Sequence, residues 1–192
     1  MKVALEAGAP VTLPAARTIA EGIAVRRAGD KTLEVIKKYV DDIVVVDEEE
    51  IAEAILMLLE REKTVAEGAG ASPIAALAHH RFPALAGKKV AAVITGGNID
   101  VNVISRIIER GLVKGGRVVR LVITISDAAG SLARLTRIVA DAKASVVQIH
   151  HDRTFGRTEL NEAVVELVLE TRGFEHIEEV KAALTAGGYR LQ

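Results

Sequence analysis

Residues 114–125 read KGGRVVRLVITI, and the apolar pattern of the chain changes within this stretch. Before it, apolar residues recur at helical spacing; after the two glycines, they alternate along an extended segment. Successive side chains of a strand point to opposite sides, so one row of this segment should face a core. That row is Val119, Leu121, Ile123 and Ile125. The change predicts a linker at 114–117, with one domain over 1–116 and a second over 117–192.

The second domain is expected to contain four strands and two helices. The patterns predict a helix over 130–143, strands over 145–153 and 161–170 joined by a turn with Phe155 and Gly156, a helix over 174–186 and a last strand over 189–192. This βαββαβ order folds as a ferredoxin-like four-stranded antiparallel sheet with both helices on one face. Val164 and Val168 make the opposite face partly apolar, so we expect two such domains to pair and the protein to be at least a dimer.

The first 116 residues predict helices that alternate with short buried strands. Helices are expected over 29–40, 49–63, 74–81 and 99–111, and strands over 41–46 and 87–94. Asp47 and Glu50 have the spacing of a capping box at the start of the second helix. The alternation is typical of part of a parallel α/β sheet.

Composition excludes several classes of function. The net charge is −1, so the composition does not indicate the one-sided basic surface that binds a nucleic-acid backbone. The chain has no cysteine, which excludes disulfides, thiolate metal sites and a cysteine nucleophile. No uncharged run approaches the roughly 18 apolar residues that span a bilayer. We therefore expect a cytoplasmic protein with no membrane and no nucleic-acid partner.

A second informative stretch is VAAVITGGNID, residues 90–100, in which an apolar run ends at Thr95, Gly96 and Gly97. Backbone amides at such a strand end, before a helix, suit an anion or the polar edge of a ring. A tight turn without a ligand has the same pattern. Glu67 lies in another glycine-rich turn, where a glutamate can equally be a solvated turn residue.

The histidines do not predict a metal site. The neighbours His79 and His80 diverge on a helix, and neighbouring histidines at 150 and 151 point to opposite faces of a strand. His150 and Asp152 share a strand face, but a third ligand is not evident. We expect no bound metal.

Three segments together resemble the second half of the catalytic domain of threonine dehydratase (threonine ammonia-lyase). They are RTIAEGIAVRRAGDKTLEVIKKYVDDIVVVDEEEIAEAI (17–55), TVAEGAGA (64–71) and VITGGNIDVNVISRIIERGLVKGGR (93–117). The resemblance covers nearly all of residues 1–116 and implies part of a fold-type II α/β domain that uses pyridoxal phosphate. Residues 117–192, with SDAAGSLARL (126–135), resemble the ACT domain appended to many of these enzymes.

The resemblance implies roles for five residues at the cofactor. Thr95 would point its hydroxyl at the pyridine nitrogen, and a neutral hydroxyl would not stabilise a protonated ring nitrogen. Gly22 would lie beside the ring, and Glu67 near the ring or the substrate. We expect Gly96 and Gly97 of the same motif to line the cofactor as well. In the AEGIAV motif the family usually has aspartate at the position of Glu21, which precedes Gly22.

The family's remaining motifs are not found in this sequence. The resemblance implies a Schiff-base lysine in an S-x-K-x-R-G context, an S-x-G-N loop for the substrate carboxylate and a glycine-rich phosphate loop, all preceding the segment matched here. No lysine of this chain has that context. Without the lysine no group tethers the cofactor or takes the α-proton. We expect no catalytic residue in this chain, no activity of the chain alone and weak or no binding of pyridoxal phosphate, with the chain starting at an internal start, a cloning boundary or a gene split.

The ACT resemblance implies an amino-acid effector at a domain interface, beside the loop between the first strand and first helix. The candidate residues are Asp127, Ala128, Gly130, Ser131 and Leu132. Aspartate at 127, alanine at 129 and valine at 146 depart from residues frequent in amino-acid-binding relatives. A domain that only dimerises is therefore the other interpretation.

Two functions follow. The first is the C-terminal and regulatory part of a threonine dehydratase, whose parent reaction converts L-threonine to 2-oxobutanoate and ammonia. The alternative is a non-catalytic amino-acid-sensing or dimerising protein that retains a remnant of an enzyme. Serine dehydratase or racemase activity remains open, because the substrate loop is not in this sequence.

Overall fold

The computed structural model describes residues 1–154 and 159–192, and the chain divides into two compact units, Met1–Ile108 and Glu109–Gln192. The predicted turn with Phe155 and Gly156 lies outside the described residues. Helix α5 (Val101–Lys114) begins in the first unit and ends in the second. It therefore continues through Gly111, where the sequence predicted its end.

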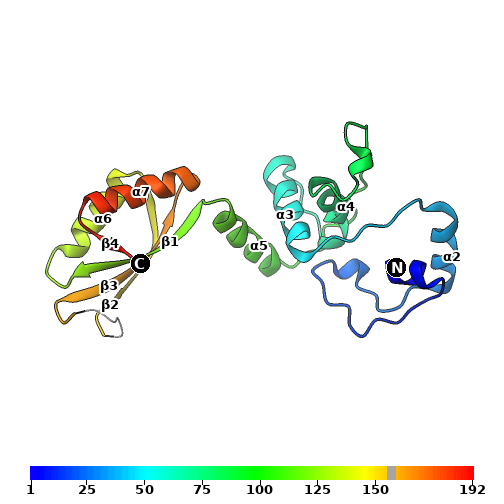
Figure 1. Cartoon of the computed structure of the whole chain (residues 1–192), viewed down its shortest axis with the longest axis horizontal. Coiled ribbons are helices and arrows are strands. Elements are labelled where there is room, and N and C mark those ends of the chain that lie inside the picture. The colour runs from blue at the N-terminus through cyan, green and yellow to red at the C-terminus, as the bar shows by residue number, and fades with distance from the viewer. Residues whose placement is uncertain (155–158) are drawn as a thin grey trace. The chain divides into compact units, whose positions relative to one another are not determined.

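Helices dominate the first unit (Figure 1). Besides the start of α5, they are α1 (Lys2–Ala7), the short η1 (Glu21–Ile23), α2 (Asp30–Tyr39), α3 (Glu48–Met57), the π-helical η2 (Leu58–Glu62), α4 (Gly68–Ala78) and the short η3 (Pro83–Leu85). Their core is small and rich in alanine, with the side chains of Ile51, Ile55 and Leu58 buried among Ala54, Ala66, Ala71 and Ala75.

The predicted capping box at the start of α3 is confirmed. The Asp47 side chain accepts from the backbone N–H of Glu50 at 2.9 Å, and the Glu50 side chain accepts from the N–H of Asp47 at 2.9 Å. These two bonds satisfy amides that the first turn of a helix leaves without partners.

The two strands predicted in the first unit are wrong. Residues 41–46 and 87–94 lie outside any strand, and Val45 and Val93 are 61% and 71% exposed. A strand exists only where a neighbour accepts and donates its backbone hydrogen bonds. Among the described residues of this unit the single β-bridge joins Thr12 to Arg27, so neither segment has a ladder partner.

Helix α4 begins six residues before the predicted start at residue 74. Glycine lowers helix propensity, which is why the GAGA stretch predicts a turn. Packing overrides that preference, because Gly68 and Gly70 are buried against the backbone of other segments. The first turns of this helix therefore take part in tertiary contacts.

The second unit has the predicted βαββαβ order. Its elements are β1 (Val118–Ser126), α6 (Ser131–Asp141), β2 (Ser145–Asp152), β3 (Glu162–Glu170), α7 (Phe174–Ala186) and β4 (Arg190–Leu191). The strands form one antiparallel sheet in the order β2-β3-β1-β4, with β2 and β4 at its edges. Both helices cover one face of it (Figure 1).

One side-chain row of each central strand packs under these helices. Fully buried Ile123, Leu167 and Leu169 contact a core that includes Leu135 of α6 and Leu184 of α7. Fully burying one such side chain contributes about 1.5–3 kcal/mol. The period-two pattern of β1 therefore correctly predicted which of its side chains face the core.

The sheet's outer face and one edge remain open. Val164 and Val168, which the sequence placed on that face, are half-buried. Among the described strands, β2 pairs only with β3, and it exposes Val146, Val147 and Ile149 at 40%, 57% and 38%. No helix of the described chain is long and apolar enough to cross a membrane.

Candidate functional site

Three glycine-containing segments of the first unit meet at Glu67. The backbone N–H of Glu67 donates to the carbonyl of Gly96 at 3.2 Å. A Cβ at Gly22 would lie 3.2 Å from Glu67 Oε1, and a Cβ at Gly96 would lie 2.6 Å from the same oxygen. The half-buried Glu67 carboxylate thus lies against two backbones that have no side chain in its way.

The backbone of Thr95 is held in place by close packing against helix α4. A Cβ on Gly70 of α4 would lie 1.8 Å from the Thr95 carbonyl oxygen, so only glycine allows this approach. The next residue, Gly96, has φ +72°, a conformation that side chains disfavour. Gly97 lies close to Val65, where an added Cβ would be 2.8 Å from the carbonyl oxygen. Helix α4 and the TGGN segment are therefore packed backbone to backbone.

The Thr95 side chain, in contrast, is available. The residue is exposed, and its hydroxyl has no hydrogen bond to any described residue. The structure brings Gly22, Glu67, Thr95 and Gly96 together from distant parts of the sequence, with Gly97 adjoining. This corner offers a neutral hydroxyl, a carboxylate and bare peptide backbone.

A charge cluster around the buried Glu50 supports α4 from the other end. Glu50, with a side chain 9% exposed, accepts from Arg81 Nη2 at 2.5 Å. His79 Nδ1 lies 3.8 Å from Glu50, and its Nε2 lies 3.2 Å from Glu53 Oε2. The N–H of Asp47, and then Arg81, hold the pKa of Glu50 below its ordinary value, while burial opposes the shift. The cluster ties α3 to the segment that follows α4.

In the second unit, the candidate effector loop is partly occupied by its own contacts. The Asp127 N–H donates to the Asn161 carbonyl at 2.8 Å, and its carboxylate pairs with Arg153 at 2.9 Å. The N–H of Ser131 donates to the carbonyl of Ala128 at 3.1 Å. The backbone amides of Asp127 and Ser131 therefore already have partners within the unit.

The other two candidates there have structural roles. Gly130 has φ +83° and precedes α6, and Leu132 packs against the core of this unit. Ser131 is buried, with 3% exposed, and accepts a hydrogen bond from Arg134.

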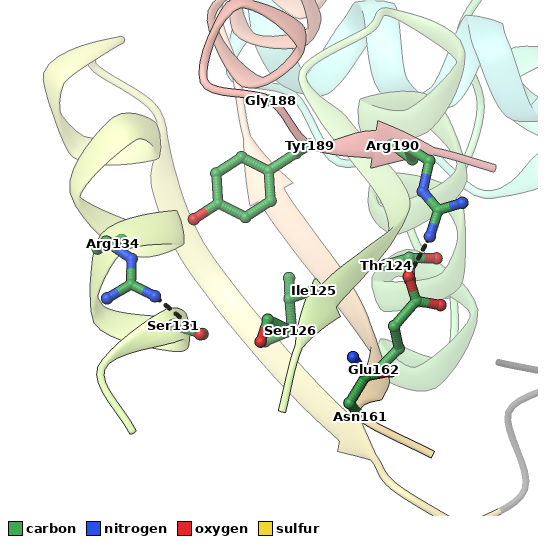
Figure 2. A pocket seen from close by; sticks show the side chains of 10 residues that line it. All are labelled: Thr124, Ile125, Ser126, Ser131, Arg134, Asn161, Glu162, Gly188, Tyr189 and Arg190. Carbon is green, nitrogen blue, oxygen red and sulfur yellow. Dashed lines mark hydrogen bonds and ion pairs between the residues drawn. The ribbon is translucent and has the colours of Figure 1, made fainter. Parts of the chain in front are cut away.

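The structure also contains a pocket that sequence reasoning missed. It lies at the end of β1, beside the first turns of α6 and the start of β4, and it includes Arg134, Glu162 and Tyr189 (Figure 2). Polar residues at strand and helix ends look like ordinary surface in a sequence, so no periodic signal marked them. Among described residues, no group of three or more histidine, aspartate or glutamate side chains is arranged to hold a metal ion.

Comparison with known proteins identifies the first unit's relatives. The profile of the family described as "Pyridoxal-phosphate dependent enzyme" matches residues 1–96. The chain belongs to this family. Pyridoxal phosphate is therefore the cofactor to test against the corner at Glu67.

The similar curated proteins are threonine ammonia-lyases. The chain is 48% identical over 185 residues to L-threonine ammonia-lyase of Geobacter sulfurreducens. This match covers 96% of this chain and 46% of that protein. It is 50% identical over 175 residues to the enzyme of Thermotoga maritima, with coverage of 91% and 43%. The chain thus spans less than half the length of these relatives and is related to threonine dehydratases.

A solved structure shows the same relationship. The processed form of threonine deaminase isoform 2 from Solanum lycopersicum matches with a TM-score of 0.52 and 28% identity. The match covers 56% of this chain and 32% of that one.

The Glu67 corner fits part of a pyridoxal phosphate pocket. Two glycines leave bare backbone on either side of Glu67, so a flat ring could approach without meeting a Cβ. The exposed Thr95 hydroxyl can donate to or accept from a ring nitrogen. The residues present would therefore hold an edge of the ring.

Proposed function

We propose that this chain supplies one side of the cofactor pocket of an L-threonine ammonia-lyase, which converts L-threonine to 2-oxobutanoate and ammonia. The observation that carries the proposal is the meeting of Gly22, Glu67 and Gly96 beside the exposed Thr95. The identity of about half of all positions with two threonine ammonia-lyases supports the same reaction.

Pyridoxal phosphate, when bound, would act as the electron sink for loss of the β-hydroxyl group. The chain's own contribution is positional. The Thr95 hydroxyl, fixed by the close packing of its carbonyl on Gly70, would bind the pyridine nitrogen without adding a charge. Glu67, whose backbone is tied to Gly96, would orient the ring or the substrate.

We propose further that the 192 residues alone do not catalyse the reaction. No lysine in them lies in the S-x-K-x-R-G context that would tether the cofactor. Borohydride reduction in the presence of pyridoxal phosphate should leave no unique pyridoxyl-lysine in a mass spectrum, and no 2-oxobutanoate should form. A single modified lysine together with turnover of threonine would contradict this proposal.

The reaction itself can be tested by complementation. The chain would be coexpressed with a polypeptide carrying the motif-bearing half of the Geobacter sulfurreducens relative, and 2-oxobutanoate would be measured. Thr95→Ser should keep activity, because it retains the neutral hydroxyl. Thr95→Asp should lower kcat by a factor of about 10 or more, since a carboxylate, unlike the neutral hydroxyl, would stabilise a protonated ring nitrogen. Equal activity of the two variants would argue against the assigned role of Thr95.

For the second unit we propose an ACT-type regulatory domain that pairs with a second copy. The exposed apolar side chains of the β2 edge support pairing, because an open edge of this kind favours association. The loop at Asp127–Leu132 is the proposed amino-acid effector site. Isothermal titration with isoleucine, valine, threonine and serine tests it, and no heat with any of them would leave pairing as the domain's role.

A further inference from the structure

The pocket of the second unit has a volume of about 310 Å³ and is lined by four different parts of the fold, one of which, the start of β3, contributes Glu162. Ser126 comes from the end of β1, Arg134 from α6, and Tyr189 from the segment leading into β4 (Figure 2). This volume is at the lower end of the range for small-molecule sites, which suits a ligand of a few heavy atoms.

Arg134 provides a charge that is not neutralised. Its Nη2 donates to Ser131 Oγ at 3.0 Å, and it forms no ion pair with any described residue. A Cβ at Gly130 would lie 3.4 Å from Nη1, so the guanidinium lies beside a residue with no side chain. The buried Ser131 holds the guanidinium in position with one bond, and its other N–H groups remain for a ligand.

The opposite wall carries a pair of charges that cancel. Arg190 Nη2 donates to Glu162 Oε1, and the Glu162 side chain is 22% exposed. Since this carboxylate already has a cationic partner, it offers little attraction to an ammonium group. The net charge of the three ionised groups lining the pocket is therefore positive.

Two hydroxyls lie within reach of the same space. Ser126 and Tyr189 both line the pocket, and in Figure 2 the Tyr189 ring extends toward the α6 side that carries Arg134. A hydroxyl can donate to a carbonyl or hydroxyl oxygen of a ligand whose carboxylate binds the guanidinium.

We propose that this pocket binds a small organic acid with one net negative charge, a 2-oxo or 2-hydroxy carboxylate. Arg134 pairs with the carboxylate in the bidentate manner that guanidinium favours, and Tyr189 donates to the neighbouring oxygen. An amino-acid zwitterion binds less well, because its ammonium group would meet a positive pocket whose one carboxylate is already paired. The site is separate from the proposed effector loop except for Ser131, and it does not depend on the proposed lyase reaction.

The test is titration of the 192-residue chain, labelled with ¹⁵N, with 2-oxobutanoate as the probe. Saturable shifts should appear at Gly188 and Tyr189, and L-2-aminobutanoate, which differs only at the amino group, should bind at least tenfold more weakly. Equal or tighter binding of L-2-aminobutanoate would overturn the preference for an anion. Tighter binding of inorganic phosphate than of 2-oxobutanoate would overturn the assignment to a carboxylate.

Matched variants locate the site. Arg134→Gln should weaken 2-oxobutanoate binding roughly 10- to 100-fold, the usual effect of losing a charged hydrogen bond. Arg137→Gln removes the same charge from the same helix outside the pocket and should change binding less than twofold. Tyr189→Phe should weaken it severalfold while the fold is retained. Equal losses in Arg134→Gln and Arg137→Gln, or shifts confined to residues 127–129, would refute the proposed site.

Discussion

Single glycines decide the geometry of the candidate cofactor site. Gly70 lies inside a helix, where alanine is intrinsically better by about 1 kcal/mol. Its backbone nevertheless touches the Thr95 carbonyl so closely that a Cβ would fall 1.8 Å from the oxygen. Propensity and packing therefore make opposite predictions for the same substitution.

We predict that Gly70→Ala destabilises the first unit by about 1–3 kcal/mol, because the TGGN segment must move to admit the methyl group. Urea denaturation of the variant measures this. Gly29→Ala is the control, since its Cβ would meet only the Thr32 side chain, with the rotatable hydroxyl at 3.2 Å and Cβ at 3.7 Å. A gain in stability for Gly70→Ala would show that the close approach is not maintained in solution.

Glu50 provides a pH prediction. Folding lowers the pKa of Glu50 from its ordinary value of 4.5. The carboxylate therefore contributes its full stabilisation at pH values above 4.5, and this contribution is lost as the pH falls through the lowered pKa. We predict that stability falls as pH drops below 4.5, and that Glu50→Gln makes this dependence shallower. Urea midpoints between about pH 3 and 6 measure both slopes. Parallel curves for the two proteins would exclude Glu50 as a source of the dependence.

The candidate residues of the Glu67 corner could be proposed from the sequence because AEGIAV, AEGAGA and TGGN are local motifs that resemble those of a known family. Their meeting at Glu67 could not, since a backbone contact such as that of Gly70 with Thr95 has no local signal. The pocket at Arg134 and Tyr189 was missed for the same reason. Its residues come from β1, α6, the start of β3 and the segment leading into β4, which meet only in the folded unit.

At the scale of elements, the second unit was predictable and the strands of the first were not. Strand β1 shows its buried apolar row at alternate positions, Leu121, Ile123 and Ile125, because this face packs on the helices. The apolar runs at 41–46 and 87–94 have the composition of buried strands. Composition cannot supply a neighbouring strand, and among the described residues they remain extended without a ladder.

The β2 edge leads to a prediction about association. Val147 is 57% exposed where the register of β2 with β3 is irregular. Because lysine on an edge strand opposes pairing, Val147→Lys should shift the proposed dimer toward monomer. Light scattering after gel filtration measures the mass. Val113→Lys, at a residue of α5 with the same 57% exposure, should leave the mass unchanged. A monomeric parent protein, or a dimer unaffected by Val147→Lys, would contradict pairing through β2.

At the scale of the molecule, the two larger of the three buried clusters among the described residues lie in different units. The residues buried with Ile55 come from the first unit up to Ile107, and those buried with Leu135 come from Leu121 onward. The first core is mostly alanine, while the second consists of larger aliphatic side chains between a sheet and two helices. Since apolar area sets the hydrophobic contribution, the second unit should be the more stable of the two.

Two matched substitutions that shorten a buried side chain, one in each core, test whether the units unfold separately. Leu135, with 0% exposed, fills the second core, and Leu135→Ala should cost about 2–5 kcal/mol there. Ile55, with 2% exposed, has the corresponding place in the first core. We predict that Leu135→Ala accelerates hydrogen exchange in β1, β3 and α7 but not in α3 and α4, and that Ile55→Ala has the reverse effect. Mass spectrometry of deuterated peptides resolves the two sets. Helix α5 begins in one unit and ends in the other, so its peptides distinguish separate from joint unfolding most clearly. Faster exchange along the whole length of α5 in both variants would mean that the two cores unfold together.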